Sequence, residues 1–160
     1  MNAYDFDETV YYGDSEFHFI EYIFAKYPSM KKYARRYKFY RFLQKKLKLI
    51  SRDAARVKIF AFLKVLDNVD KELAEFWAIH EKNLKKWYLD VKTTGDVIVS
   101  ATPGFILEPI AEKLGVKLIA TRMDKKTGEL SGTYNYGDVR PEKFYSDSYS
   151  DEPMAKLAAE

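Results

Sequence analysis

The spacing of hydrophobic residues changes twice along this chain, from a strand-like run to helical spacing and back to strand-like runs. This change constrains the fold more than any other feature. Short apolar runs at 3–6, 96–100 and 116–120 have the length of buried strands, and the run at 96–100 is rich in β-branched residues. Between the first two runs, residues 15–90 carry apolar side chains at helical spacing. Because the connection between parallel strands must be long, this pattern predicts an α/β sheet interrupted by a helical insertion.

The second half of the chain supplies the other elements of the expected sheet. Residues 105–114 have helical spacing, Lys125–Gly128 is typical of a hairpin turn, and residues 143–146 indicate a further strand. We therefore expect a doubly wound parallel sheet built from residues 1–14 and 91–160. About four helices are expected within residues 15–90.

Charge is distributed unevenly along the sequence. Residues 26–66 hold 14 of the 27 Lys and Arg but one acid, Asp53, which gives +13 there and −10 elsewhere. In this region Met30, Tyr33, Tyr37, Tyr40 and Leu47 are predicted to form the buried stripe of a basic amphipathic helix. Such a helix can be a solvated element packed on its neighbours, or it can lie on an anionic membrane. Its Tyr and Phe, interleaved with Lys and Arg, also suit stacking and phosphate contact with nucleic acid, which is the partner we favour least.

The composition excludes several classes of site. There is no cysteine, so disulfides, thiolate nucleophiles and cysteine zinc sites are ruled out, and the two histidines, His18 and His80, form no metal or triad motif. Residues 1–7 are acidic where a secretory signal is basic, and no apolar run approaches the roughly 20 residues of a membrane span. We expect a cytoplasmic protein. The oligomeric state is not indicated.

Polar side chains follow three of the predicted strands. Asp5 and Asp7 end the first strand, Ser100 and Ala101 end the second, and an acidic loop, 147–151, follows the last. The carboxyl ends of neighbouring parallel strands meet in one crevice, so these loops are expected to converge. Close carboxylates suit Mg²⁺, and free backbone N–H groups before a helix suit a phosphate oxygen.

These three motifs, in this order and with a helical insertion after the first, resemble the haloacid dehalogenase (HAD) superfamily of phosphatases. The phosphoserine-phosphatase-like branch, which carries a helical cap, is the most similar. The resemblance implies that residues 15–90 form the cap of a HAD-like Rossmannoid core. It also implies a Mg²⁺-dependent phosphomonoester hydrolase acting on a small phosphorylated metabolite, phosphoserine-like or a lipid phosphate.

The resemblance further assigns a role to each site residue. Asp5 is the nucleophile that forms an aspartyl-phosphate, and Asp7 is the general acid and base. Ser100 and the Ala101 N–H bind the phosphoryl group. The Mg²⁺ ligands are Asp5, Asp7 through its backbone carbonyl, Asp147 and, in support, Asp151.

One part of the family pattern is missing from the sequence. Phosphatases of this kind have a lysine on a helix before the last acidic loop, and residues 135–143 are too few for that helix and a strand. Lys143 is the candidate for the catalytic cation, with Arg140 beside it. A residue at the start of a strand is nevertheless far from the strand's carboxyl end. The alternative is a catalytically weakened or truncated HAD-like protein that binds phosphate or a partner.

Overall fold

The structure is a computed structural model that describes residues 1–132, 140–147, 155–156 and 158. Its centre is a sheet in the order β4-β3-β2-β1-β5. The strands are β1 (Ala3–Asp5), β2 (Val97–Pro103), β3 (Lys117–Met123), β4 (Leu130–Gly132) and β5 (Phe144–Tyr145). All neighbours are parallel except β3 and β4, which form an antiparallel hairpin. The predicted α/β class and parallel sheet are confirmed.

The strand order determines where a site can form. The chain moves outward from β1 to β2 and β3, then returns to the other side of β1 to form β5. This reversal makes the boundary between β1 and β5 a topological switch point, where a crevice opens at the carboxyl ends of the strands. Register pairs Tyr4 with Tyr145, so the residues that follow these two leave the sheet side by side.

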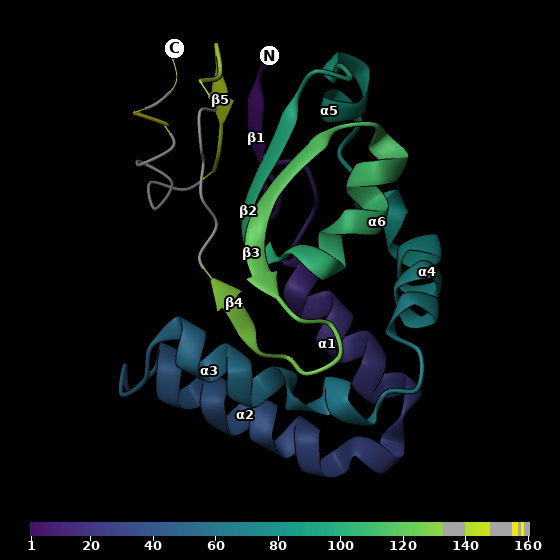
Figure 1. Cartoon of the computed structure of the whole chain (residues 1–160), viewed down its shortest axis with the longest axis vertical. Helices are drawn as coiled ribbons and strands as arrows, with labels where there is room; N and C mark the ends of the chain where they lie inside the picture. Colours follow the sequence, from purple (N-terminus) through teal and green to yellow (C-terminus); the bar gives the residue numbers. More distant parts are fainter. Residues whose placement is uncertain (133–139, 148–154, 157, 159–160) are drawn as a thin grey trace.

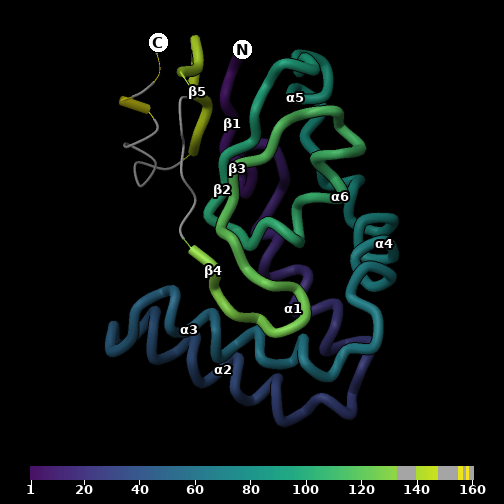
Figure 2. The backbone as a smooth tube through the Cα atoms, viewed as in Figure 1, coloured from purple at the N-terminus to yellow at the C-terminus, as the bar shows by residue number. Residues whose placement is uncertain are grey.

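Five α-helices separate β1 from β2, one more than expected. They are α1 (Ser15–Lys26), α2 (Lys31–Lys45), α3 (Arg52–Ile59), α4 (Val69–His80) and α5 (Lys86–Val91), with 3-10 turns at Pro28–Met30, Phe60–Val65 and Glu81–Asn83. A further helix, α6 (Gly104–Leu114), joins β2 to β3. Figure 1 and Figure 2 show α4, α5 and α6 beside the sheet, whereas α2 and α3 form a separate layer at the end where β4 lies.

The helices and the sheet share one hydrophobic core. Phe6, Phe19, Phe76 and Ile106 are fully buried and belong to a single cluster that joins β1, α1, α4 and α6. The indole N–H of Trp77 donates to the carbonyl of Ile106 at 2.7 Å, which satisfies a polar atom inside this cluster. Helices α1 and α4 are therefore anchored to the sheet, whatever role the insertion as a whole has.

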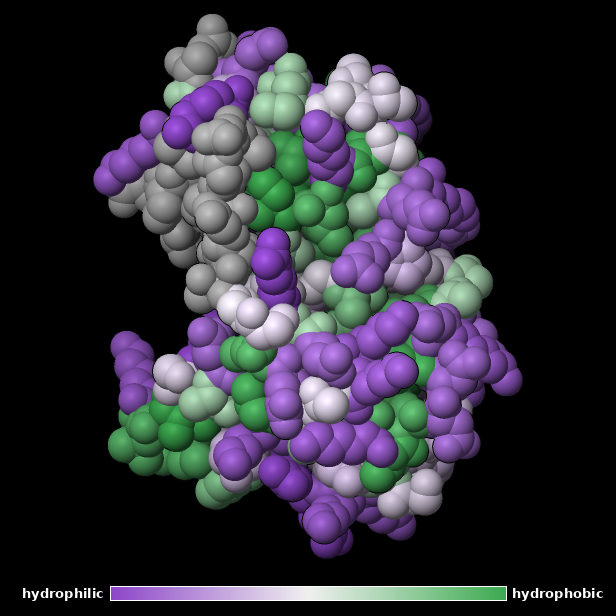
Figure 3. Space-filling model, in the orientation of Figure 1, coloured by the Kyte–Doolittle hydropathy of each residue, from purple (hydrophilic) through white to green (hydrophobic). Residues whose placement is uncertain are grey.

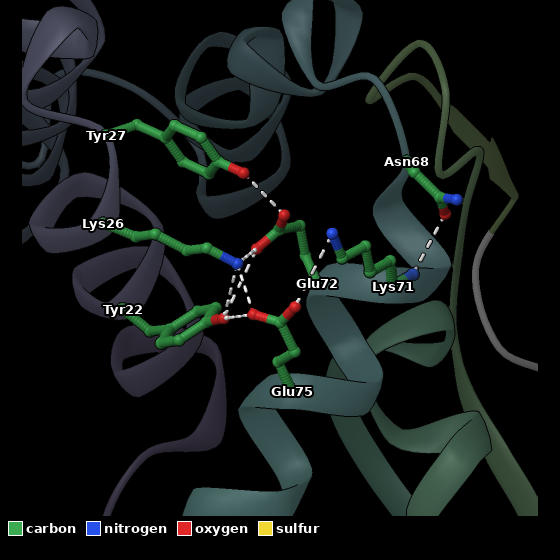
Figure 4. A network of polar contacts seen from close by, with 7 residues as sticks. All are labelled: Tyr22, Lys26, Tyr27, Asn68, Lys71, Glu72 and Glu75. Carbon is green, nitrogen blue, oxygen red and sulfur yellow. Dashed lines mark hydrogen bonds and ion pairs between the residues drawn. The ribbon is translucent and has the colours of Figure 1, made fainter.

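A polar network joins α1 to α4 at the edge of this core (Figure 4). The Lys26 ammonium lies 2.8 Å from Glu72 Oε2 and also pairs with Glu75. The Tyr27 hydroxyl donates to Glu72 Oε1 at 2.6 Å. Burial raises the pKa of the Glu72 carboxyl, but the bonds from Lys26 and Tyr27 lower it more, so the net pKa is below its usual range.

The predicted stripe of the basic helix is partly wrong. Tyr37 is buried, and Met30, Tyr33 and Tyr40 pack against the core, but α2 ends at Lys45 and Leu47 is 48% exposed in the following loop. Leu47 continues the helical spacing beyond the last residue of α2, where the backbone no longer forms the helix face that the spacing predicts. In the part of the chain that the structure describes, no helix is long and apolar enough to cross a membrane.

Candidate active site

The loop after β1 folds back on itself in a tight turn. The N–H groups of Val10 and Tyr11 both donate to the Phe6 carbonyl at 2.9 Å, and Glu8 adopts a left-handed φ of 62°. Gly13 has a φ of 94°, and an added Cβ would lie 2.6 Å from His18 Cε1, so only glycine is accommodated. This turn holds Asp5 and Asp7 at the carboxyl edge of the sheet.

Both oxygens of the Asp7 carboxyl accept hydrogen bonds. Oδ1 accepts from the Ser15 N–H at 2.7 Å and Oδ2 from the Thr102 hydroxyl at 2.6 Å. Burial raises the pKa of Asp7 to about 6, against the lowering effect of the bonds from Ser15 and Thr102, and the charge of Asp14 raises it further. A carboxyl with this pKa can exchange a proton near neutral pH.

An irregularity at the end of β2 directs Thr102 toward Asp7. The pairing with β3 shifts between Ser100 and Pro103, and the Thr121 hydroxyl donates to the Ala101 carbonyl at 2.7 Å. The Ser100 hydroxyl accepts from the Thr102 N–H at 3.1 Å and is 3% exposed. β2 therefore ends with hydroxyl groups at the same edge as the two aspartates, before the first turn of α6.

The loop after β5 is fixed to the loop after β1 through a threonine. The Asp147 N–H donates to Thr9 Oγ1 at 3.0 Å, and the Thr9 hydroxyl donates to Asp147 Oδ1 at 3.3 Å. This contact joins the first and last predicted motifs, 138 residues apart. Asp151 lies outside the described residues, and among those described no group of three acidic or histidine side chains could hold a metal ion.

The backbone surroundings of Lys143 bear on its proposed role as the catalytic cation, and those of Asp14 show what this acid does. The Lys143 carbonyl accepts from the Ala3 N–H at 2.9 Å, so Lys143 enters β5 at the amino end of the sheet, opposite the edge at which Asp5 lies. The structure does not bring the Lys143 backbone to the site. Asp14 is the N-cap of α1 and accepts from the Phe17 N–H at 2.8 Å, as acids in such turns commonly do.

Sequence reasoning missed the residues that hold the carboxylates. Thr9 lies two residues after Asp7 and Thr102 lies two residues after Ser100, so both are within the motifs that the sequence singles out. Their place in these motifs was the signal available. Lys85 gave no such signal. Its N–H donates to the Val10 carbonyl at 2.8 Å and its ammonium donates to the Glu8 carbonyl, so it braces the turn that carries Asp7.

A cavity of about 560 Å³ lies between α3 and the carboxyl ends of β2 and β3. Its lining residues are Arg52, Asp53, Arg56, Ala101, Thr121, Leu130 and Gly132. Arg56 is 3% exposed and its guanidinium donates to Glu16, with Nη2 at 2.5 Å from Oε2. Arg52 is exposed, so it supplies the guanidinium that a ligand in this cavity would meet.

Comparison with known proteins identifies the family. The sequence model of the haloacid dehalogenase-like hydrolases matches residues 3–156. A crystal structure of a protein with unknown function from Bordetella pertussis Tohama I has the same fold, with a TM-score of 0.66 and 21% identity over 84% of this chain. This chain spans 66% of the length of that protein. Among curated proteins, none matches the present chain significantly. The chain belongs to the haloacid dehalogenase-like hydrolases.

Proposed function

We propose that the protein is a Mg²⁺-dependent phosphomonoesterase that acts through an aspartyl-phosphate at Asp5. The observation that carries the proposal is the pair of carboxyls at the end of β1. Asp5 ends the strand, and Asp7 is held by Ser15 and Thr102 with a pKa raised to about 6 by burial. Two carboxyls whose environments differ can divide nucleophilic and proton-transfer roles.

In the proposed reaction, a carboxylate oxygen of Asp5 attacks phosphorus while the bond to the leaving oxygen breaks. Asp7 gives its proton to that oxygen, so the alcohol departs neutral. Asp7 then accepts a proton from the water that attacks the aspartyl-phosphate. Inorganic phosphate leaves and the Asp5 carboxylate is restored. Ser100 and the Ala101 N–H orient the phosphoryl oxygens during both steps.

The donor atoms at this edge are compatible with Mg²⁺. This ion prefers oxygen ligands and is commonly held by one or two carboxylates together with the substrate phosphate and water. Asp5 and Asp147 supply carboxylates from the neighbouring strand ends, and Asp7 supplies its backbone carbonyl because its carboxyl oxygens already accept bonds. Asp151 is a further proposed ligand. The ion would neutralise the phosphoryl oxygens and the Asp5 carboxylate.

The substrate we propose is a small phosphate ester, phosphoserine-like or a lipid phosphate, entering through the cavity beside Ala101. Arg52 lines that cavity and would attract an anionic substrate. The helices between β1 and β2 would then act as a cap, as in the phosphoserine-phosphatase-like branch. The proposed cap boundaries remain residues 15–90.

A second candidate is a phosphate-binding protein with weakened catalysis. It is favoured by the backbone position of Lys143, which enters β5 at the amino end of the sheet. A protein of this kind would bind Mg²⁺ and phosphate but turn over aryl phosphates poorly. Feeble turnover by the wild type that neither Lys143→Ala nor Arg140→Ala changes would favour this second candidate. A fall of about 10²- to 10³-fold in Lys143→Ala would instead give Lys143 the role of charge-stabilising donor.

Hydrolysis of para-nitrophenyl phosphate by the purified chain tests the proposal directly. We expect turnover with Mg²⁺, none with a chelator, and a covalent phosphate on Asp5 detectable by mass spectrometry after rapid acid quenching. Asp5→Asn should abolish turnover without lowering thermal stability. Asp90→Asn, which changes an exposed aspartate on α5, is the matched control and should be silent.

Two results would contradict the mechanism. Substantial turnover by a folded Asp5→Asn protein would remove Asp5 as nucleophile. Phosphate binding without any turnover in the wild-type chain would instead establish the weakened protein.

A further inference from the structure

We propose that the end of the α2–α3 hairpin is a docking surface for an anionic lipid bilayer. The surface consists of the outward face of α2 and the loop 46–50 that follows it. Its exposed apolar side chains are Phe39, Phe42, Leu47 and Leu49. Figure 3 shows hydrophobic residues gathered at this end of the hairpin, bordered by hydrophilic ones. This proposal does not depend on the proposed phosphatase activity.

The apolar residues are displayed by a structured turn. The Leu47 N–H donates to the Phe42 carbonyl at 3.3 Å and the Leu49 N–H to the Leu43 carbonyl at 3.1 Å. Lys48, between the two leucines, has a left-handed φ of 52°. Leu49 is 69% exposed and Leu47 is 48% exposed. The turn therefore holds two leucines outward, although burying them would be favourable by the hydrophobic effect.

The helix continues the same surface. Phe39 and Phe42 lie three residues apart, on the side of α2 opposite the buried Tyr37, and are 55% and 51% exposed. Helix α3 packs against α2, so α2 is the outer layer of this part of the molecule (Figure 1). A line of apolar side chains thus runs from the middle of α2 to the loop.

The charge around these residues selects the partner. Residues 31–50 contain nine Lys and Arg and no Asp or Glu. In the described part of the chain, every salt bridge uses a cation outside this segment. Within the residues that the structure describes, no carboxylate therefore forms a salt bridge with any of these nine cations. Basic side chains around inserted apolar ones are the combination that binds anionic lipid headgroups and the acyl boundary together.

The side chains at the loop favour lipid over nucleic acid. Binding of single strands uses aromatic rings on which bases stack. The two loop residues are leucines, which cannot stack, and Leu49 is the most exposed large apolar side chain among the described residues. Insertion into an acyl region uses such leucines directly.

Co-sedimentation of the full chain with vesicles tests the proposal. Vesicles of phosphatidylcholine with phosphatidylglycerol should bind the protein, and vesicles of phosphatidylcholine alone should leave it in solution. The double substitution Leu47→Ser/Leu49→Ser should weaken binding at least about tenfold, because two side chains no longer enter the acyl boundary. Lys46→Gln/Lys48→Gln should weaken it about tenfold.

Matched variants keep the test independent of folding. Ile79→Ser changes a 50% exposed side chain on α4 and should leave binding unchanged. All variants should retain the melting temperature of the wild type, since none of these side chains is buried. Wild-type protein that stays in solution with anionic vesicles would overturn the proposal, as would equal binding by the double leucine variant.

Two other outcomes would replace the lipid partner. Salt-sensitive binding to a single-stranded oligonucleotide, with no binding to vesicles, would assign the surface to nucleic acid. A dimer in light scattering that Leu47→Ser/Leu49→Ser dissociates, again without vesicle binding, would assign it to a second copy of this chain.

Discussion

The carboxyl edge of the sheet and the α2–α3 hairpin depart from ordinary protein architecture in opposite ways. At the sheet edge, polar groups are buried: Ser100 and Thr102 are at most 3% exposed, and Thr102 donates to the half-buried Asp7. At the hairpin, apolar groups are exposed, as Leu49 illustrates at 69%. Both arrangements cost stability in water, so each is informative about function.

The two regions are also stabilised differently. The buried edge depends on hydrogen bonds that join distant segments, such as Thr102 to Asp7. The hairpin depends on local bonds of the loop and on packing between α2 and α3. Substitutions of the residues that form these bonds at the edge, such as Thr102 and Asp7, should therefore change chemistry and stability together, whereas substitutions at the tip of the hairpin should change neither.

After the loss of turnover expected for Asp5→Asn, the largest effect is expected for Asp7→Asn. The amide cannot donate or accept the transferred proton, so turnover of an aryl phosphate should fall about 10²- to 10⁴-fold. Mg²⁺ binding should persist, because the proposed contact is the Asp7 backbone carbonyl. Steady-state kinetics with calorimetric Mg²⁺ titration measures both. Unchanged turnover with lost Mg²⁺ binding would reverse the assigned roles.

Lys26→Met tests whether buried polar groups also matter away from the site. It leaves Glu72, 4% exposed, without its cation, so the free energy of unfolding should fall near neutral pH by more than the loss of a fully exposed ion pair would cost. The lowered pKa of Glu72 contributes stability above the unfolded pKa, and that contribution is lost as pH falls. The difference between wild type and variant should thus shrink in acid.

Denaturant titrations across pH measure this difference, and Lys71→Met is the matched control. Lys71 lies 4.0 Å from Glu75 and is largely exposed, so its loss should change stability little at any pH. If both substitutions changed the free energy of unfolding equally, the burial of Glu72 would not contribute to the effect of losing Lys26.

Asp7→Asn should also stabilise the chain without metal, in a pH-dependent manner. Burial raises the pKa of Asp7 to about 6, so its protonated form is favoured by folding. That stability is complete below the unfolded pKa and is lost as pH rises through about 6. We expect the variant to gain about 1 to 3 kcal/mol at about pH 8 and almost nothing at about pH 4. Chemical denaturation with a chelator present measures this, and a gain at both pH values would contradict it.

The smallest effect is expected at the hairpin. Leu49→Ser should change the free energy of unfolding by less than about 0.5 kcal/mol, because the side chain is already in water. Leu63→Ser, at a leucine that is 2% exposed, is the contrast and should cost about 2 to 5 kcal/mol. Thermal denaturation of both variants measures the difference, and a large loss for Leu49→Ser would show that the turn is structural.

The sequence by itself determined the class of the fold and the edge of the sheet at which the three motifs gather. The strand runs, the hairpin turn at Lys125–Gly128 and the caps of α1 and α3 depend on neighbouring residues, so local spacing and propensity predict them. The resemblance of the three motifs to one family added the roles of Asp5 and Asp7, which remain proposals.

Only the tertiary structure decided which side chains hold those motifs and which remain outside. The bond from Thr102 to Asp7 spans 95 residues and that from Thr9 to Asp147 spans 138, and no local pattern specifies such pairs. Leu47 was predicted inside because its spacing continues the helix, but the backbone turns after Lys45 and carries it into solvent. Periodicity describes a face only while the helix lasts, and packing between distant segments determines what covers that face.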